Sequence, residues 1–128
     1  YFSDSAYHVV RRVDVQGMIS TVAGSGEPGF SPDGTLATQA FLDQPWGLAV
    51  SREGVVYVSD SRNNRVRGVT SEGALETVAG GDIPGDAGDE GPATEARLNE
   101  PHGLCLYGDD ILLISDHHNS RIKAVKLR

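Results

Sequence analysis

The sequence predicts an all-β fold in which a four-stranded antiparallel sheet recurs every 56 residues. The first observation is an internal repeat without gaps: 18 of the 48 positions in residues 19–66 are identical to the residue 56 positions later. The second is that one period, residues 45–78, holds four short apolar or β-branched runs separated by turn-forming residues, which is the pattern of strands joined by hairpins. The third is that no stretch keeps an apolar helical period over a helix length.

Each predicted strand of that period has its own signal. Residues 46–50 form a compact apolar run after Pro45, and the tight turn at 52–54 ends it. Residues 55–58 are β-branched and aromatic, as expected of a strand that is buried on both faces. The turn-rich segment 60–64 leads to an alternating run at 66–70, and the turn at 71–73 leads to the fourth run at 75–78.

A four-stranded sheet that repeats with a fixed period is typical of a β-propeller, in which blades stack face to face around an axis. We expect a complete blade at residues 45–78, strands two to four of the preceding blade at 1–22, and strands one to three of the following blade at 101–128. Residues 23–44 and 79–100 are the expected inter-blade loops. A chain of 128 residues supplies about 2.3 periods of 56, whereas a closed ring needs four or more blades. The prediction is therefore an incomplete ring that belongs to a larger propeller.

Two segments carry a family resemblance. "PWGLAVSREGVVYVSDSRNNRVRGVTSEG" and "PHGLCLYGDDILLISDHHNSRIKAVK" resemble NHL repeats, whose hallmark is a Pro-x-Gly strand start followed by a Ser/Ala-Asp-x-x-Asn/His-x-Arg/Lys turn. The long intervening loops resemble those of NHL proteins such as the teneurins. The resemblance implies NHL-type propeller blades, with six blades in the usual ring. The leading functional expectation is a non-catalytic scaffold or protein-interaction module, without a cofactor, whose partners are another protein and the remaining blades of the parent chain.

Residues that recur at the same place in each blade are expected to be structural. This set is Asp60, Asn63, Arg65, Asp116, Asn119 and Arg121. We expect each aspartate to accept backbone N–H groups within its own turn and to pair with the arginine of that turn. A catalytic residue is usually unique, so this recurrence argues against catalysis, and no catalytic residue is assigned.

Residues that differ between the copies are the better candidates for binding. Trp46 becomes His102, Ser61-Arg62 becomes His117-His118, and Ala49 becomes Cys105, which is expected to be a small buried residue. The candidate binding face is Trp46, Arg62, Phe30, Phe41, His102 and His117.

Two alternative functions remain open at this stage. Neutral imidazoles are common zinc ligands, so His102, His117 and His118 would be the metal ligands if the chain were part of a propeller lyase or hydrolase, although no metal site is assigned. RNA binding, known for some NHL propellers, is the weaker alternative because the net charge of −7 opposes a nucleic-acid partner. No apolar run approaches the roughly 18 residues of a membrane span, so no membrane partner is expected.

Overall fold

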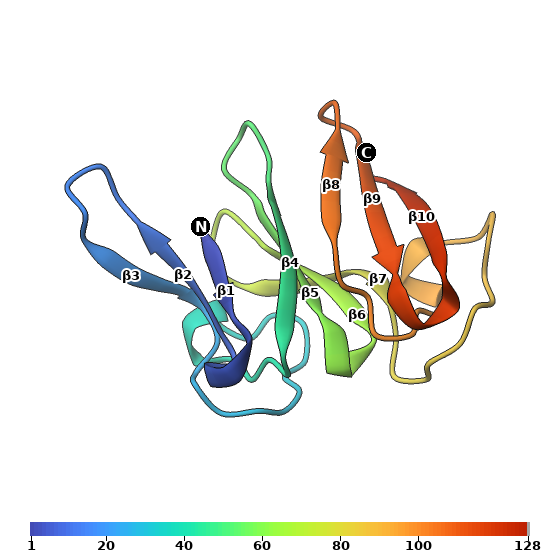
Figure 1. Cartoon of the computed structure of the whole chain (residues 1–128), viewed down its shortest axis with the longest axis horizontal. Helices are drawn as coiled ribbons and strands as arrows, with labels where there is room; N and C mark the ends of the chain where they lie inside the picture. The colour runs from blue at the N-terminus through green and yellow to red at the C-terminus, as the bar shows by residue number, and fades with distance from the viewer. Residues whose placement is uncertain (128) are drawn as a thin grey trace.

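The computed structural model describes residues 1–127, in which ten strands form three antiparallel sheets that stand side by side (Figure 1). The strands are β1 (Phe2–Asp4), β2 (Val9–Val13), β3 (Ile19–Ala23), β4 (Pro45–Val50), β5 (Val56–Asp60), β6 (Arg65–Val69), β7 (Leu75–Gly80), β8 (Leu104–Tyr107), β9 (Ile111–Asp116) and β10 (Arg121–Lys126). Five 3₁₀ turns accompany them in this part of the chain: η1 (Ser5–Tyr7), η2 (Ala37–Gln39), η3 (Ser61–Asn63), η4 (Ala93–Glu95) and η5 (His117–Asn119). The all-β prediction is confirmed.

The middle sheet has the order β4-β5-β6-β7, which is that of a four-stranded blade. Every residue of β5 is buried, because the neighbouring strands cover its edges and the two flanking sheets cover its faces. Its β-branched and aromatic composition suits this position. The first sheet has the order β1-β2-β3 and the third the order β10-β9-β8. The Ser-Asp pair of β1 aligns with that of β5 and β9, so β1 stands in the second position of its sheet.

The apolar core lies between the sheets rather than within them. One cluster joins the first sheet to the second, and the other joins the second to the third. Each long loop sends a fully buried leucine into one cluster, Leu42 into the first and Leu98 into the second. Burying a leucine side chain contributes about 1.5–3 kcal/mol, so the loops contribute to stacking the blades as well as to connecting them.

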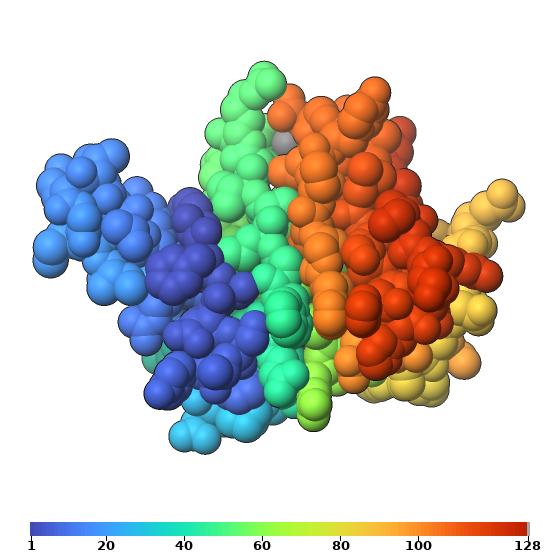
Figure 2. Space-filling model, viewed as in Figure 1, coloured from blue at the N-terminus to red at the C-terminus, as the bar shows by residue number. Residues whose placement is uncertain are grey.

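The outward faces of the two terminal sheets are open within residues 1–127. The β2–β3 hairpin extends away from the rest of the molecule (Figure 2), and Val15 at its tip is 96% exposed. On the third sheet, Tyr107 and Ile122 are exposed. Cys105 is also exposed, so the expectation that it is buried is wrong. Its counterpart Ala49 packs against the neighbouring blade, whereas no described sheet covers Cys105.

The 56-residue repeat extends to unusual backbone angles. The 3₁₀ turns between second and third strands end on His8, Asn64 and Ser120, with φ of 57°, 54° and 52°. All three lie in the left-handed region that side chains other than glycine rarely adopt. Because each of these turns joins the second strand of its sheet to the third, all three lie at the same end of their sheets, which is the lower end in Figure 1.

Candidate functional site

The recurrent aspartates lie fully buried at the start of the turns that join second and third strands. Asp60 accepts a hydrogen bond from the backbone N–H of Asp43 at 2.8 Å and another from the side-chain amide of Asn63 at 2.9 Å. The third sheet repeats the arrangement, because Asp116 accepts from the backbone N–H of Asn99 at 2.8 Å and from Asn119 at 2.7 Å.

Each asparagine also holds the loop that precedes its blade. Asn63 donates to the carbonyl of Gly29 at 2.8 Å, and Asn119 donates to that of Gly85 at 2.7 Å. The Asp–Asn pairs therefore fasten the inter-blade loops to the turns. This differs from the expected pattern, in which each aspartate would accept backbone N–H groups of its own turn, because the N–H donor belongs to the loop 17 residues earlier.

The arginines have different partners from those expected. Arg67 contacts Asp60, at 3.5 Å, whereas Arg65 pairs with Asp82 at the surface. Arg65 and Arg67 are two residues apart on one strand and so share a face, and their guanidinium groups lie 4.3 and 5.3 Å from the centre of the Phe30 ring. Arg67 thus contacts the buried carboxylate, and the guanidinium of Arg65 lies closer to the Phe30 ring.

The third sheet keeps the first arginine of this pair and has a lysine in place of the second. Arg121 lies 3.8 Å from both Asp86 and Asp89, and Lys123 stands where Arg67 stands in the middle sheet. Lys123 donates to Asp89 at 2.9 Å. The expected pairing of Arg121 with Asp116 is replaced by ion pairs with the loop.

Burial dominates the electrostatics of Asp60 and raises its pKa to about 6. The hydrogen bonds from Asp43 and Asn63 and the charge of Arg67 act in the opposite direction. Burial also lowers the pKa of Arg67, which the carboxylates of Asp60 and Asp33 partly oppose. Since Asp60 and Arg67 are both inaccessible to solvent, neither can touch a substrate in this conformation.

Serine hydroxyls cross the gap between adjacent sheets, a feature that sequence reasoning missed. Ser3 donates to the carbonyl of Trp46 at 2.5 Å, and Ser59 donates to the carbonyl of His102 at 2.6 Å. Ser5 and Ser61 donate in the same way, to the carbonyls of Pro45 and Pro101, both at 2.5 Å. The recurrence of serine at these places was visible in the sequence, but the acceptors lie 40 or 43 residues away and no local pattern indicates them.

Near these serine hydrogen bonds between sheets, three aromatic rings form a stack at the lower end of the sheets. The rings of Trp46 and His102 have centroids 4.9 Å apart and planes 17° apart. The rings of His102 and His117 are 4.1 Å apart and nearly parallel, at 9°. His118 is tilted by 42° against His117 and contacts Glu100 at 3.3 Å. We call Trp46, His102 and His117 the ring stack.

In the ring stack the outer ring, Trp46, is exposed, and the middle ring, the imidazole of His102, carries no charge at neutral pH. Trp46 is 51% exposed. Partial burial, together with the nearby imidazole of His117, lowers the pKa of His102, so this imidazole is uncharged at neutral pH. The arrangement presents a flat apolar surface that a partner's ring or guanidinium can stack upon.

The stacked geometry is poorly suited to a metal ion. The nitrogen lone pairs of an imidazole lie in the ring plane, so the lone pairs of His102 and His117 occupy nearly parallel planes and cannot meet at one ion. Among residues 1–127, no group of three or more His, Cys, Asp or Glu side chains is placed to hold a metal.

The other candidate binding residues lie in the adjoining loop and turn. Phe30 is 43% exposed and Phe41 42% exposed. A β-carbon on Gly29 would lie 3.3 Å from the β-carbon of Phe41. The backbone N–H of Phe41 donates to the hydroxyl of Ser31. Arg62 is exposed in η3. The structure thus gathers Trp46, His102 and His117 into one stack. The ring of Phe30 lies separately, beside the guanidinium groups of Arg65 and Arg67 on β6.

Comparisons with known proteins place this architecture in a family. The NHL repeat model matches residues 42–69. Human Teneurin-4 is 36% identical over 104 residues, which cover 71% of this chain and 4% of Teneurin-4. Protein SUPPRESSOR OF QUENCHING 1, chloroplastic, from Arabidopsis thaliana is 30% identical over 139 residues, which cover 99% of this chain and 13% of that protein. The chain therefore spans a small part of the relatives that it matches.

A solved structure has the same fold. A structural genomics protein of unknown function from Bacteroides thetaiotaomicron superposes with a TM-score of 0.85 at 26% identity, over 97% of this chain and 31% of that one. Within residues 1–127, no helix is both long and apolar enough to cross a membrane. Taken with the blade order and the recurrent Asp–Asn turns, these matches show that the chain belongs to the NHL-repeat β-propeller family.

Proposed function

We propose that the chain is a non-catalytic protein-interaction module within a larger propeller, and that the ring stack contacts the partner. In this proposal residues 45–78 are one blade, residues 1–22 and 101–128 belong to the blades on either side, and 23–44 and 79–100 are the loops between them.

The observation that carries the proposal is the half-exposed ring of Trp46 stacked on imidazoles of the next blade. Tryptophan is among the residues that most often dominate binding energy at interfaces. Rings already held in a stack lose little conformational freedom on binding, which favours affinity. The proposal that the module is non-catalytic is supported by the burial of Asp60 and Asp116, which support the fold and are not accessible to a substrate.

The partner's contacting residue is expected to be flat and cationic. The chain has a net charge of −7, and Glu100 lies beside the imidazoles through its contact with His118. An arginine side chain satisfies both conditions, since its guanidinium stacks on aromatic faces and carries a positive charge. A peptide segment with an exposed arginine is therefore the partner class that the site favours.

The test is selection from a random peptide display library against the full chain, followed by affinity measurement of the selected peptides. We expect arginine to be enriched at one position and Trp46→Ala to weaken binding by at least about tenfold. Tyr107→Ala is the matched control, because Tyr107 is 71% exposed at the opposite end of β8 and should leave the affinity unchanged. Equal losses in the two variants, or selected peptides without arginine or aromatic residues, would contradict the proposal.

The metal-dependent alternative is tested in the same preparation by zinc titration. We expect no stoichiometric zinc binding, because His102 and His117 are stacked. A tight one-to-one zinc complex that is lost in His117→Ala would instead favour the lyase or hydrolase alternative.

RNA binding is tested by titration at low salt, where an electrostatic complex would be strongest. A salt-sensitive complex would favour that alternative over the interaction module.

A further inference from the structure

The imidazole of His8 lies where the first sheet meets the loop between β3 and β4. Its Nδ1 atom accepts a hydrogen bond from the backbone N–H of Gln44 at 3.0 Å. The same atom lies 3.8 Å from a carboxylate oxygen of Asp43. The His8 side chain is 15% exposed, so protein groups form most of its surroundings. One ring nitrogen therefore faces a backbone donor and a carboxylate acceptor.

The protonation state of the ring decides which of these two contacts forms. In a neutral imidazole one nitrogen carries a proton and the other is an acceptor, whereas in the imidazolium ion both nitrogens are donors. The hydrogen bond from Gln44 thus requires a neutral ring with its proton on Nε2. A ring that takes a second proton from water, on Nδ1, points an N–H at the N–H of Gln44. Its favourable partner is then the carboxylate of Asp43, so the two contacts exclude each other.

The loop between β7 and β8 has the same contact without the groups that titrate. Asn64 stands 56 residues after His8, and its Oδ1 accepts the backbone N–H of Glu100 at 3.0 Å. Asn99 stands 56 residues after Asp43. A side-chain amide carries its acceptor oxygen without an ionisable proton. Both members of the titratable pair at the first loop are therefore replaced by asparagine at the second.

The hydrogen bond to the imidazole holds Gln44 in an uncommon backbone conformation. Gln44 has a φ of +51°, in the left-handed region that favours glycine. Residues in such conformations persist where the surrounding contacts hold them. The adjacent Asp43 is held separately, because its N–H donates to Asp60 at 2.8 Å and its carbonyl accepts from the N–H of Arg62 at 3.1 Å. Loss of the bond to the imidazole therefore releases the backbone at Gln44 in particular.

Other ionisable groups of residues 1–127 border this contact. Asp4 lies at the start of η1, the turn that ends on the imidazole, and accepts the backbone N–H of Tyr7. On the second sheet, Asp60 and Arg62 hold the backbone of Asp43. Burial raises the pKa of Asp60 to about 6. Protonation of Asp60 is therefore the competing source of a pH effect in this loop.

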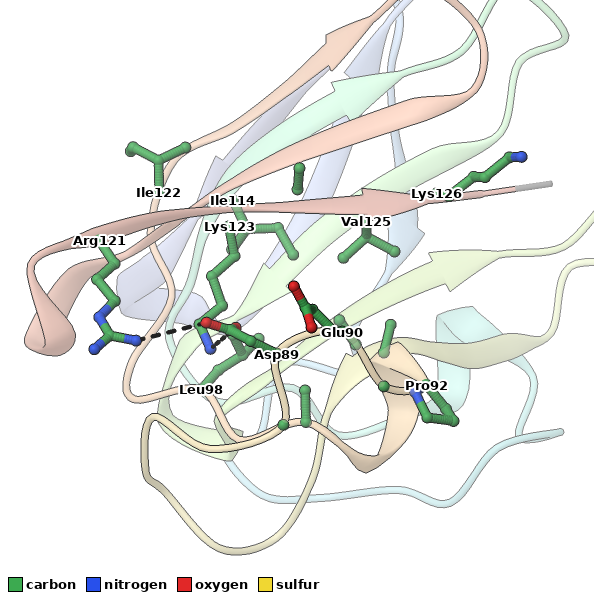
Figure 3. Close-up of a pocket in the computed structure, with 16 residues that line it drawn as sticks. Asp89, Glu90, Pro92, Leu98, Ile114, Arg121, Ile122, Lys123, Val125 and Lys126 are labelled. Atoms are coloured by element: carbon green, nitrogen blue, oxygen red, sulfur yellow. Dashed lines mark hydrogen bonds and ion pairs between the residues drawn. The ribbon is translucent and has the colours of Figure 1, made fainter.

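Ion pairs hold the middle of each loop. Asp33 in the first loop contacts Arg67 at 3.3 Å, and Asp89 in the second accepts a hydrogen bond from Lys123 at 2.9 Å (Figure 3). Burial acts to raise the pKa of Asp33, but hydrogen bonds from Thr77 lower it overall. The hydrogen bond from Lys123 lowers the pKa of Asp89. Both carboxylates stay ionised in the range where imidazoles titrate, so the pH response is confined to the end of the first loop.

We propose that His8 and Asp43 form a pH-dependent switch at the end of the loop between β3 and β4. With a neutral imidazole, the ring accepts the N–H of Gln44 and fixes the loop end. On acidification, the ring turns to the carboxylate of Asp43 and releases Gln44. Imidazoles change charge between about pH 5 and pH 8, which is the range in which the switch is tested. The switch concerns the folded chain alone and does not depend on the function proposed above.

The experiment measures amide hydrogen exchange of the full chain by NMR at about pH 5 and about pH 8, as protection relative to an unstructured chain. We expect the protection of the Gln44 amide to fall by at least about fivefold at the lower pH, as for a donor left unpaired. The Glu100 amide is the matched control and should keep its protection. His8→Asn should remove the pH dependence at Gln44. Asn64→His combined with Asn99→Asp should create a pH dependence at Glu100.

A second measurement needs no variant. The ¹⁵N chemical shifts of the His8 ring report which nitrogen carries the proton, and we expect the Nε2–H tautomer at the higher pH. An Nδ1–H tautomer there would overturn the proposal, as would unchanged protection of Gln44 or an equal loss at Glu100. A loss at Gln44 that persists in His8→Asn would assign the effect to Asp60 and also overturn it. If His8→Asn does not fold, the tautomer and the comparison of the two amides in the unmodified chain still decide.

Discussion

Gly47 and Gly103 occupy the same position in successive blades, yet replacement by alanine should destabilise the fold only at Gly47. A β-carbon on Gly47 would overlap the carbonyl oxygen of His102 and lie 2.8 Å from the backbone nitrogen of Leu104. A β-carbon on Gly103 would have the β-carbon of Ser115 as its nearest neighbour, at 3.6 Å, which is ordinary contact. The difference arises because the third blade stacks against Gly47, whereas no described blade stacks against Gly103.

The magnitude follows from two opposing effects. Overpacking costs typically 1–3 kcal/mol, and the upper end applies at Gly47 because the atoms that it meets belong to backbone and cannot rotate away. Replacing glycine by alanine also restricts the unfolded chain, which stabilises by about 0.4–1 kcal/mol where the native backbone permits it. We therefore expect Gly47→Ala to destabilise by about 2 kcal/mol, and Gly103→Ala to be neutral or to stabilise by about 0.5 kcal/mol.

The assay is urea unfolding of the full chain and both variants, followed by circular dichroism. Trp46 provides a second readout, because its ring stacks on His102, the residue that a side chain at position 47 would displace. Its fluorescence should change in Gly47→Ala and not in Gly103→Ala. If the free energies of unfolding of the two variants differed by less than about 0.5 kcal/mol, the close approach of the blades at Gly47 would be refuted.

Three further predictions concern the serine hydrogen bonds between sheets, the buried carboxyl group of Asp60 and the ring stack. Ser59→Ala should cost about 1–3 kcal/mol of unfolding free energy, because it removes the hydroxyl that pairs with the partly buried N–H of Gly47 and carbonyl of His102. Ser115→Ala should cost under about 0.5 kcal/mol in the same urea titration. The pKa of Asp60 rises on folding to about 6 from 3.8, so the native state holds this proton more tightly and the contribution of Asp60 to stability falls as the pH rises between those values. Relative to Asp60→Asn, the unmodified chain should thus lose about 2–3 kcal/mol of stability between pH 4 and pH 7; a gain would mean that hydrogen bonds outweigh burial. Protonation of His102 should quench Trp46, the sole tryptophan, with a midpoint below the ordinary 6.5 because the pKa of His102 is lowered, and His102→Phe should abolish that transition.

The strands were predictable from sequence because their signals are local. Alternation, β-branching and turn residues placed the four strands of the middle sheet within two residues of their observed bounds at each end. The partners of buried polar groups were not predictable, because they are set by how the blades stack. The recurrence of Arg65 as Arg121 favoured Arg65 as the partner of Asp60, but in the folded chain Arg67 makes that contact, while both guanidinium groups lie near the Phe30 ring.

The exposure of Cys105 was wrongly predicted for a related reason. A residue in a first strand is covered by the next blade, not by its own sheet, and Ala49 shows this in the middle sheet. The local sequence around Cys105 is that of a buried strand, so burial there depends on the neighbouring blade rather than on the strand itself.

Recurrence of a residue is a good guide to structure, but variation alone is a poor guide to function. His8 and Asn64 differ, yet each accepts a backbone N–H of the next loop at 3.0 Å, through its Nδ1 and Oδ1 respectively. What is shared at this position is therefore a hydrogen-bond acceptor for the following loop, and not a particular residue type. Trp46 and His102 differ in another way, because the blade joint uses their backbone carbonyls and makes no demand on their side chains. The side chains of Trp46 and His102 are therefore not constrained by this hydrogen bond between the sheets, whereas the position of His117 is occupied in the middle sheet by Ser61, whose hydroxyl does make such a bond.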